Sequence, residues 1–239
     1  MDVPWGGETV TLRGDWDLRG RYDDYLYGVD VRGKSVLDVG TATGWISFEV
    51  ERHGAAEVVG LDMASDVRPQ YVPYSFLKTE PDTRLAEIQK GKSYRNGYWF
   101  CHQQFGSAAK VVYGDAHLAS DHISGADIVI LGQILVHQRD PLEVLHQCAK
   151  IAGETLVIIE GSFEFDQPVM TFGGLGGNFY SWFHLSTTMY RRYLEILGFE
   201  VTSMRKSAYP CHHRDLKGDV DVWTIVAKRV GPTLGRNAA

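Results

Sequence analysis

Three absences narrow the classes of protein to which this 239-residue sequence can belong. It has only three cysteines, Cys101, Cys148 and Cys211, and their wide spacing predicts neither a disulfide framework nor a zinc knuckle. No apolar run approaches about 18 residues, so no transmembrane helix is expected. The first residues lack the apolar core of a signal peptide. These features predict a reduced, soluble, cytoplasmic protein without a membrane partner.

The sequence also lacks an excess of basic residues. Lys and Arg number 24 against 30 Asp and Glu, a formal charge of −6, which disfavours broad electrostatic binding to nucleic acid. The 44% apolar and 23% charged content is typical of a folded domain rather than a disordered chain. The 12 Tyr, 10 Phe and 6 Trp are enough to line an organic pocket. We therefore expect a small-molecule acceptor as partner, not nucleic acid, and a monomer or homodimer.

Apolar runs alternate with helical patterns along the chain. Residues 34–40 and 57–62 read as buried strands, and the helical pattern over 44–53 between them predicts a right-handed βαβ unit. Five more strands are expected at 110–115, 126–132, 154–160, 199–204 and 220–228, with a helix beginning at Pro141 after the capping residue Asp140 and another over 187–197. Because no helix joins the last two strands, we expect them to form an antiparallel pair at one edge. The pattern predicts an α/β fold: a doubly wound, seven-stranded, mostly parallel sheet with an antiparallel edge strand.

The seven-strand pattern accommodates the whole chain as one domain, 1–239. The residues outside it form an N-terminal cap segment, 1–33, and two insertions, 64–109 and 161–186. The first insertion contains two short helical patterns, near 83–89 and 93–105. Long loops of α/β folds usually lie at the ligand end of the sheet, so we expect both insertions on the substrate side.

The strongest chemical signal runs from Asp38 to Gly44, with Asp62 at the end of the next strand. Gly40 permits a sharp turn off the strand, and Gly44 permits close approach of a ligand at the start of the helix. Asp62 is placed to accept hydrogen bonds from both ribose hydroxyls. The spacing is not the G-x-G-x-x-G of a dinucleotide site, and Asp38 would repel a phosphate. The pattern favours S-adenosylmethionine, which carries an ammonium, a sulfonium and a ribose but no phosphate.

The stretch Val36–Gly44 resembles the first motif of class I S-adenosylmethionine-dependent methyltransferases. Asp62 resembles their ribose-binding acid, Asp115-Ala116 their adenine-contacting position, and Gly132-Gln133 the motif that borders the methionine moiety. The resemblance implies the Rossmann-like methyltransferase fold, methyltransferase activity and S-adenosylmethionine as cofactor. With Trp16, whose ring face would attract a sulfonium, the expected cofactor-binding residues are Trp16, Asp38, Gly40, Thr41, Gly44, Asp62, Met63, Asp115, Ala116, Gly132 and Gln133.

A closer resemblance is to the tRNA wobble-uridine carboxymethyltransferase-like branch of that class. It rests on Trp16-Asp17-Leu18, on the 134–141 stretch and on Asn178-Phe179-Tyr180. The tRNA-modifying members are longer at the N-terminus and use a Tyr-His pair to hold a carboxylated cofactor, where this chain has Val136-His137. These departures favour ordinary S-adenosylmethionine.

Several side chains are candidates for binding or activating the acceptor. His137 and His184 are the candidate general bases, although either can serve instead as a structural histidine bonded to the backbone. The candidate substrate-binding residues are Tyr180, Trp182, Trp99 and His102. Cys211-His212-His213 suggests a metal, but neighbours on one strand point to opposite faces, so no metal is expected.

Three functions remain open from the sequence. The leading hypothesis is methyl transfer to a small organic acceptor, at oxygen. The second is methylation or carboxymethylation of tRNA or another RNA, for which Lys90, Lys92 and Arg95 form a basic stretch interleaved with Tyr94, Tyr98 and Trp99. The third is a non-catalytic cofactor-binding regulator or partner subunit, because a fold does not fix a function.

Overall fold

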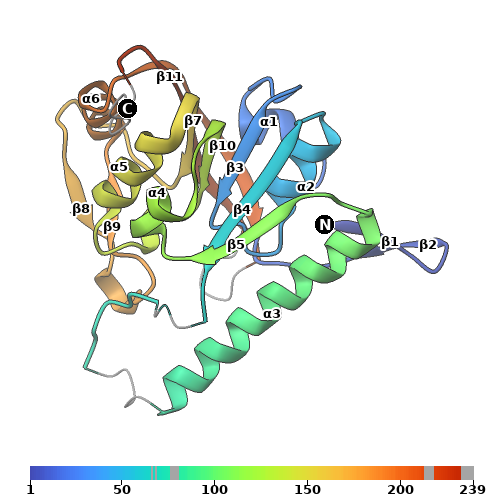
Figure 1. Cartoon of the computed structure of the whole chain (residues 1–239). Coiled ribbons are helices and arrows are strands. Elements are labelled where there is room, and N and C mark those ends of the chain that lie inside the picture. The colour runs from blue at the N-terminus through green and yellow to red at the C-terminus, as the bar shows by residue number, and fades with distance from the viewer. Residues whose placement is uncertain (66, 68, 76–80, 213–217, 233–239) are drawn as a thin grey trace.

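The centre of the molecule is one seven-stranded sheet (Figure 1). The computed structural model describes residues 1–65, 67, 69–75, 81–212 and 218–232, and only the backbone of 81–91 and 177. The strands of the sheet are β3 (Ser35–Val39), β4 (Glu57–Met63), β5 (Lys110–Gly114), β6 (Ala126–Gly132), β7 (Ala152–Glu160), β10 (Phe199–Cys211) and β11 (Gly218–Arg229). Their order is β10-β11-β7-β6-β3-β4-β5. The seven strands and the doubly wound α/β fold predicted from the sequence are confirmed.

Strand direction separates the two ends of this sheet. β3 pairs parallel with β4 and β6, β4 with β5, and β6 with β7, whereas β11 is antiparallel to both β7 and β10. The expected antiparallel pair at one edge is therefore present, with the antiparallel strand β11 one position in from that edge. β10 continues to Cys211 rather than ending at 204, because its antiparallel pairing with β11 runs on to Cys211 and Gly218.

Alternation along the strands supplies a core on each face of the sheet. Val36 and Ile130 face the side covered by α1 (Tyr22–Leu26) and α2 (Trp45–Arg52). Leu37 and Leu131 face the side covered by α4 (Ala119–His122), α5 (Pro141–Ile151) and α6 (Thr187–Ile196). α5 begins as predicted, because the Asp140 side chain accepts a hydrogen bond from Glu143 N at 3.1 Å.

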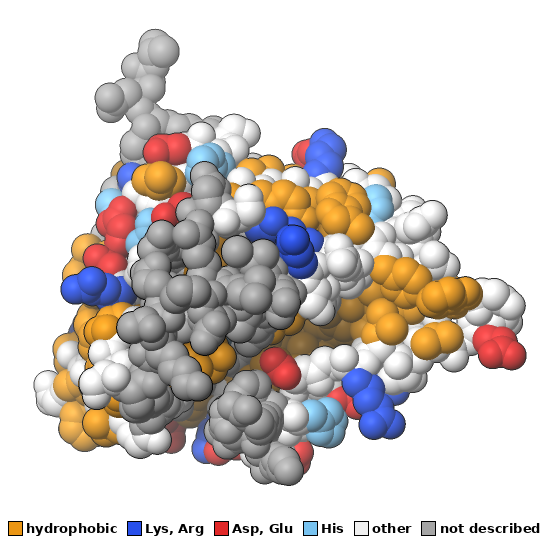
Figure 2. Space-filling model, turned by 90° about the horizontal axis from the view of Figure 1, so that it is seen from below, with side chains coloured by type: hydrophobic (Ala, Val, Ile, Leu, Met, Phe, Trp, Pro, Cys, Tyr) orange, Lys and Arg blue, Asp and Glu red, His pale blue; other side chains and the backbone are white. Residues whose placement is uncertain are grey.

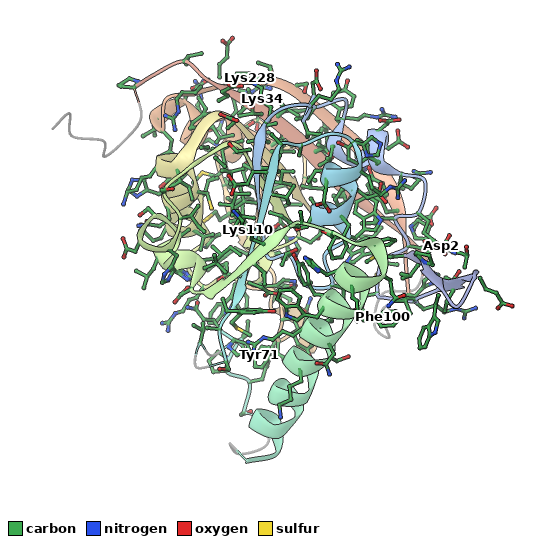
Figure 3. The ribbon with its side chains drawn as sticks, turned by 45° about the vertical axis from the view of Figure 1, so that its right-hand side comes forward. Asp2, Lys34, Tyr71, Phe100, Lys110 and Lys228 are labelled. Carbon is green, nitrogen blue, oxygen red and sulfur yellow. The ribbon has the colours of Figure 1, made fainter. Side chains whose placement is uncertain are left out.

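The first insertion forms one long helix, α3 (Pro81–Phe105), where the sequence predicted two short ones. Gly91 lies within it, but a glycine costs only about 1 kcal/mol relative to alanine in a helix interior, so it need not end the helix. The C-terminal half is anchored by Tyr98 and Cys101, which pack with Phe48 of α2 and Val3 of β1 (Asp2–Trp5). β1 and β2 (Glu8–Thr11) form a hairpin beside this end of α3 (Figures 1 and 3).

The second insertion carries a small antiparallel pair, β8 (Met170–Phe172) and β9 (Phe183–Leu185), joined through the short helix η3 (Leu175–Gly177). Two other one-turn helices, η1 (Ala116–Leu118) and η2 (Leu135–His137), follow β5 and β6. The carboxyl ends of the parallel strands point down in Figure 1, towards both insertions. Seen from below, this face has a hollow bordered by hydrophobic side chains (Figure 2).

All three cysteines are buried and carry free thiols. Among the described helices, none combines the length and apolar composition needed to cross a bilayer. The sheet thus presents its carboxyl edge, with two long insertions beside it, as the place to look for a site.

Candidate functional site

The turn after β3 is built on glycines. Gly40 has φ +81° and donates its N–H to Leu61 O at 2.7 Å, which turns the chain off the strand. Gly44, with φ +86°, precedes α2; a Cβ there would lie 2.5 Å from Phe48 Cε2 and 2.8 Å from Tyr98 Cδ2. Both positions favour glycine because side chains rarely adopt this backbone conformation, and at Gly44 there is no room for one.

Asp38 ends β3 as a buried carboxylate. Its Oδ2 accepts hydrogen bonds from Ser47 N at 3.1 Å and from Ser47 Oγ at 2.7 Å, and Ser47 Oγ lies 2.9 Å from Thr41 Oγ1. Its Oδ1 is buried with no hydrogen-bond partner among the described residues. Burial raises the pKa of Asp38 to about 6, and the hydrogen bonds from Ser47 limit that rise. Near neutral pH the carboxylate therefore offers a buried, unpaired negative oxygen.

Asp62 lies one strand over, near the end of β4. Its Oδ1 accepts a hydrogen bond from Met63 N at 2.7 Å. Burial raises the pKa of Asp62, opposed by backbone hydrogen bonds from Met63 and Ala42 and by the positive charge of Arg95. Asp62 and Asp38 thus stand at the ends of adjacent parallel strands on either side of the glycine turn.

Asp115 and Ala116 follow β5. Asp115 caps η1, and its Oδ1 accepts hydrogen bonds from His117 N and from the His117 ring, each at 2.9 Å. The third predicted acid is therefore anchored in place at the end of the next strand.

Gly132 and Gln133 end β6 beside the glycine turn. A Cβ on Gly132 would lie 2.8 Å from Ile46 Cδ1 and 3.6 Å from the Tyr25 hydroxyl, so this strand end is closely covered by α2 and α1. Gln133 has φ +55°, donates its N–H to Ile159 O at 2.8 Å, and has a buried Nε2 without a partner among the described residues.

Glu160 at the end of β7 anchors the loop that contains Gln133. Its Oε1 accepts the N–H of Leu135 at 2.6 Å, and the N–H groups of Ile134 and Val136 also point to the carboxylate. Burial raises the pKa of Glu160 to about 8, against these backbone donors. The anchored Ile134 in turn packs against the turn after β3, 3.0 Å from the Cβ position of Gly40.

Trp16 comes from the cap segment. It forms an isolated antiparallel bridge with Cys211 and packs, partly buried, on the cluster that contains Tyr25 and Tyr209. The structure therefore ties the cap segment to the far end of β10.

The second insertion is tied to the loop after β6 and to part of the first insertion. Trp182 N donates to Val136 O at 2.8 Å, and the indole Nε1 donates to Gln70 O. Val72 N donates to Phe179 O at 3.0 Å. The ring of Tyr71 meets Phe179 and Tyr180 edge-on, at centroid distances of 5.4 and 5.3 Å. We call the cluster of Tyr71, Phe179, Tyr180 and Trp182 the aromatic wall; Figure 3 shows Tyr71 below the sheet.

The two candidate bases both bond to backbone carbonyls. His137 Nδ1 lies 2.8 Å from Tyr180 O, and His184 Nδ1 lies 3.0 Å from Gly161 O. A carbonyl oxygen only accepts, so Nδ1 must donate, and in each neutral ring Nε2 is then the unprotonated nitrogen. His137 is exposed beside the aromatic wall, whereas His184 is partly buried against Gly173.

The four predicted substrate residues lie in two places. Tyr180 and Trp182 belong to the aromatic wall. Trp99 and His102 lie on α3 beside β5, the outermost strand of the parallel part of the sheet. There, Trp99 Nε1 donates to the Tyr113 hydroxyl at 3.0 Å, and His102 Nε2 bonds Ala109 O at 2.9 Å. In Figure 3 the labelled Phe100, between Trp99 and His102 in sequence, lies by the β1–β2 hairpin and away from Tyr71.

Metal-type ligands do not gather in the described part of the chain, where no group of three or more His, Cys, Asp or Glu could hold an ion. His213 of the Cys211-His212-His213 stretch lies outside the described residues. The side chain of Lys90 also lies outside them, so the predicted basic stretch is described only at Lys92 and Arg95.

The residues at the carboxyl edge fit S-adenosylmethionine. The buried, unpaired Asp38 Oδ1 suits its ammonium, and the unpaired Gln133 Nε2 suits its carboxylate. Asp62 and Asp115 provide acceptors at the two strand ends on the adenosine side. The structure thus brings ten of the eleven predicted cofactor residues to one edge of four adjacent strands, with Trp16 on the neighbouring cap.

Five residues at this site were not predicted as cofactor-site residues: Tyr25, Ser47, Arg95, Tyr98 and Glu160. Of these, Arg95 and Tyr98 were named only in the stretch considered for RNA binding. Glu160 could have been predicted from the sequence, because it is an acidic residue at the end of an apolar strand, as Asp38 nearly is. Ser47 lies one turn into the helix after the motif, where a donor to Asp38 is a reasonable expectation. The other three reach the site through packing of the cap and of α3, and no spacing rule places them.

Comparison with known proteins supports this interpretation. No protein-family model matches the chain. A tRNA U34 carboxymethyltransferase from Dichelobacter nodosus is 27% identical over 212 residues, covering 83% of this chain and 58% of that protein, so the chain spans less than two thirds of that relative's length.

Two solved structures share the fold. One, provisionally named an RNA methyltransferase, is from Pyrococcus horikoshii, with a TM-score of 0.58, 16% identity and coverage of 88% of this chain and 85% of that one. The other is the 1,6-didemethyltoxoflavin-N1-methyltransferase of Burkholderia thailandensis with S-adenosylhomocysteine bound, with a TM-score of 0.56, 14% identity and coverage of 91% and 80%. These likenesses confirm the fold and agree with the resemblance to class I S-adenosylmethionine-dependent methyltransferases; the S-adenosylhomocysteine is bound to the Burkholderia enzyme.

Proposed function

We propose that this chain is a class I S-adenosylmethionine-dependent methyltransferase whose acceptor is a small organic molecule. The observation that carries the proposal is a pair of acids, the buried Asp38 and the partly buried Asp62, on either side of a glycine turn that has no room for a side chain at Gly44. Asp38 Oδ1 has no hydrogen-bond partner in the described structure, and a buried carboxylate oxygen left unpaired is costly unless a cationic ligand pairs with it.

The cofactor would supply a methyl group activated by its sulfonium. Asp38 and Gln133 would hold the amino-acid end, Asp62 the ribose, and Asp115 with Ala116 the adenine side. The task of the protein is then to align the acceptor with the methyl group and to exclude water. The loop after β6 does this positioning, because Glu160 fixes its backbone and Ile134 packs on Gly40.

The acceptor would lie against the aromatic wall, and the transfer would be to oxygen. His137 projects beside that wall with Nδ1 bound to Tyr180 O, which leaves Nε2 as the basic nitrogen. His137 would accept the hydroxyl proton as the oxygen–methyl bond forms and the sulfur–methyl bond breaks, leaving S-adenosylhomocysteine. The aromatic surface of the wall favours an organic acceptor, and the Arg139 guanidinium, 5.7 Å from the centroid of the Trp182 ring, adds one positive charge beside it.

The proposal is tested first by cofactor binding and then by formation of a methylated product. Titration calorimetry should detect S-adenosylmethionine and S-adenosylhomocysteine binding, and absence of binding at millimolar ligand would contradict the proposal. A panel of phenols, hydroxylated heterocycles and amines with methyl-labelled cofactor should then yield a labelled product.

The variant His137→Gln should abolish transfer to oxygen without changing cofactor affinity. The control His53→Gln, on the surface at the end of α2, should not change the rate. Cofactor binding without a product from any acceptor would favour the regulator alternative.

A second candidate is RNA modification, favoured by the relative from Dichelobacter nodosus that is named as a tRNA enzyme. Of the basic stretch that motivated it, Arg95 is engaged with the Met63 carbonyl and the Tyr113 ring, which leaves Lys92 as its exposed described member. Filter binding to bulk tRNA across a salt series separates the two candidates. Affinity that falls steeply with salt supports RNA, and a weak signal insensitive to salt supports the small acceptor.

A further inference from the structure

Arg95 is a charged side chain of α3 that reaches the carboxyl ends of β4 and β5. Its Nη2 donates a hydrogen bond to Met63 O at 2.6 Å, and its Cζ lies 4.7 Å from the centroid of the Tyr113 ring. The Tyr113 hydroxyl accepts a hydrogen bond from Trp99 Nε1, four residues further along the helix. The guanidinium is therefore fixed between the ends of β4 and β5 by one carbonyl and one ring face.

Arg95 does more than attach α3 to the sheet. The helix is already anchored by the buried Tyr98 and Cys101. Burial raises the pKa of Asp62, the predicted ribose acceptor, and the positive charge of Arg95 adds to the backbone hydrogen bonds from Met63 and Ala42 that oppose this rise. It also fixes the carbonyl of Met63, whose N–H donates to Asp62.

We propose that Arg95 is a positioning residue of the cofactor site, through which the inserted helix α3 holds the 62–63 backbone in the conformation in which Asp62 binds the ribose. The proposal rests on the ribose-binding role proposed for Asp62. It assigns the first insertion a function in cofactor binding as well as on the substrate side.

The charged surroundings of Asp62 define the experiment. Arg95 faces it from α3 and Asp38 from β3, while its register partner on β5 is the neutral Tyr113. Arg95→Met removes the charge and keeps most of the stem, and Arg95→Lys keeps a charge but loses the planar fork. Lys92→Met is the matched control, because it removes one positive charge from an exposed position on the same helix. Calorimetric titration of each protein with S-adenosylhomocysteine and with adenosine, from pH 5 to 8.5, gives affinity and its pH midpoint.

In the unmodified protein, affinity should fall on acidification as Asp62 and Asp38 are protonated. Arg95→Met should bind both ligands about tenfold more weakly at neutral pH, because the Met63 carbonyl loses its charged donor, and the midpoint should move upward, because one of the groups that oppose the raised pKa of Asp62 is gone. Both ligands should lose the same factor, since the defect lies at the ribose that they share. Arg95→Lys should weaken binding with little change in midpoint, and Lys92→Met should match the unmodified protein.

Thermal unfolding without ligand checks that each variant folds. If Arg95→Met does not fold, Arg95→Lys decides: weaker binding of both ligands supports the proposal and unchanged binding refutes it. Equal affinity and midpoint in Arg95→Met and Lys92→Met would show that Arg95 only anchors the helix. If the unmodified protein binds neither ligand, the cofactor assignment itself fails, which is distinct from a defect confined to Arg95.

Discussion

The proposed cofactor half and the proposed acceptor half of the site, called here the cofactor half and the acceptor half, are built in opposite ways. In the cofactor half, Asp38, Gly40, Gly44 and Ser47 lie within ten residues of one another. The Asp38–Ser47 hydrogen bonds and the contact of Gly44 with Phe48 are local, and Leu61 and Tyr98 add contacts to Gly40 and Gly44 from outside the stretch. In the acceptor half, the aromatic wall joins residues near 70, 136 and 180 through backbone carbonyls and ring contacts. Contacts within a short stretch can be predicted from the sequence of that stretch, whereas contacts between distant segments depend on how the whole chain packs.

The two halves also differ in what they leave unpaired. The cofactor half has a buried carboxylate oxygen on Asp38 and a buried amide nitrogen on Gln133 without partners in the described structure. In the acceptor half, the polar groups of His137 and Trp182 bond neighbouring carbonyls, and the side chains that remain exposed include Phe172, at 43%, and Leu175, at 73%. The first arrangement suits a charged ligand, and the second suits an apolar one.

The sharpest test of this division is Asp62→Ala. We expect it to weaken S-adenosylhomocysteine binding by about a hundredfold, because two hydrogen bonds to a charged acceptor each contribute roughly 1.5 kcal/mol. His137→Ala, in the acceptor half, should bind the same ligand as the unmodified protein does. Calorimetry measures both, and an equal loss in the two variants would mean that the halves do not bind separate ligands.

Gly44→Ala tests whether the cofactor turn is defined by steric contact. The added methyl would meet Phe48 and Tyr98 at 2.5 and 2.8 Å in a backbone conformation that disfavours it. Gly176→Ala is the matched control in the acceptor half, with φ +68° and nothing within 4 Å of the new Cβ. Both share the backbone penalty of about 1 kcal/mol, and overpacking should cost Gly44→Ala about 2 kcal/mol more. Urea unfolding gives the difference, and equal costs would show that the turn has room after all.

Glu160 joins the two halves, and its titration should be visible in stability. Its pKa is about 8 in the folded protein against an ordinary value of 4.5, so the native state binds more protons than the unfolded state between these values. The free energy of unfolding should therefore fall as pH rises from 4.5 to 8. Asp38, with a pKa of about 6, contributes in the same direction over a lower range.

Glu160→Gln removes this slope and keeps an oxygen acceptor for Leu135 N. Its stability, from urea unfolding at several pH values, should be less dependent on pH than that of the unmodified protein. Glu160→Ala removes the acceptor as well and should cost about 1–3 kcal/mol at every pH, because buried N–H groups lose their partner. A slope that persists unchanged in Glu160→Gln would assign the titration to another group.

Sequence patterns predicted the fold and the cofactor half for related reasons. Buried strands are short apolar runs, and Asp38, Gly40, Gly44 and Asp62 follow from what a turn at a strand end requires. The same reasoning failed for the first insertion, where two helical patterns are one helix, because Gly91 weakens a helix without ending it.

The acceptor half was predicted only in part. Tyr180 and Trp182 were identified from an aromatic loop, but Gln70 and Tyr71, which complete the wall, lie in a segment without periodicity. Trp99 and His102 resembled wall residues in composition, and the structure places them at the β5 edge instead. Which segment meets which is decided by packing of the whole chain, and a single sequence does not display it.

The smallest expected effect tests how the wall is held together. Trp182→Phe keeps a ring but removes the indole N–H that bonds Gln70 O, at a cost of about 1 kcal/mol for one hydrogen bond. Hydrogen exchange at Val72 N–H, which bonds Phe179 O in the same wall, should accelerate, while S-adenosylhomocysteine affinity stays unchanged. Trp99→Phe removes a comparable indole hydrogen bond at the β5 edge and should leave exchange at Val72 as it was. If both variants, or neither, change Val72, the wall is not a unit held by its own contacts, and the acceptor half would have to be considered part of the sheet edge.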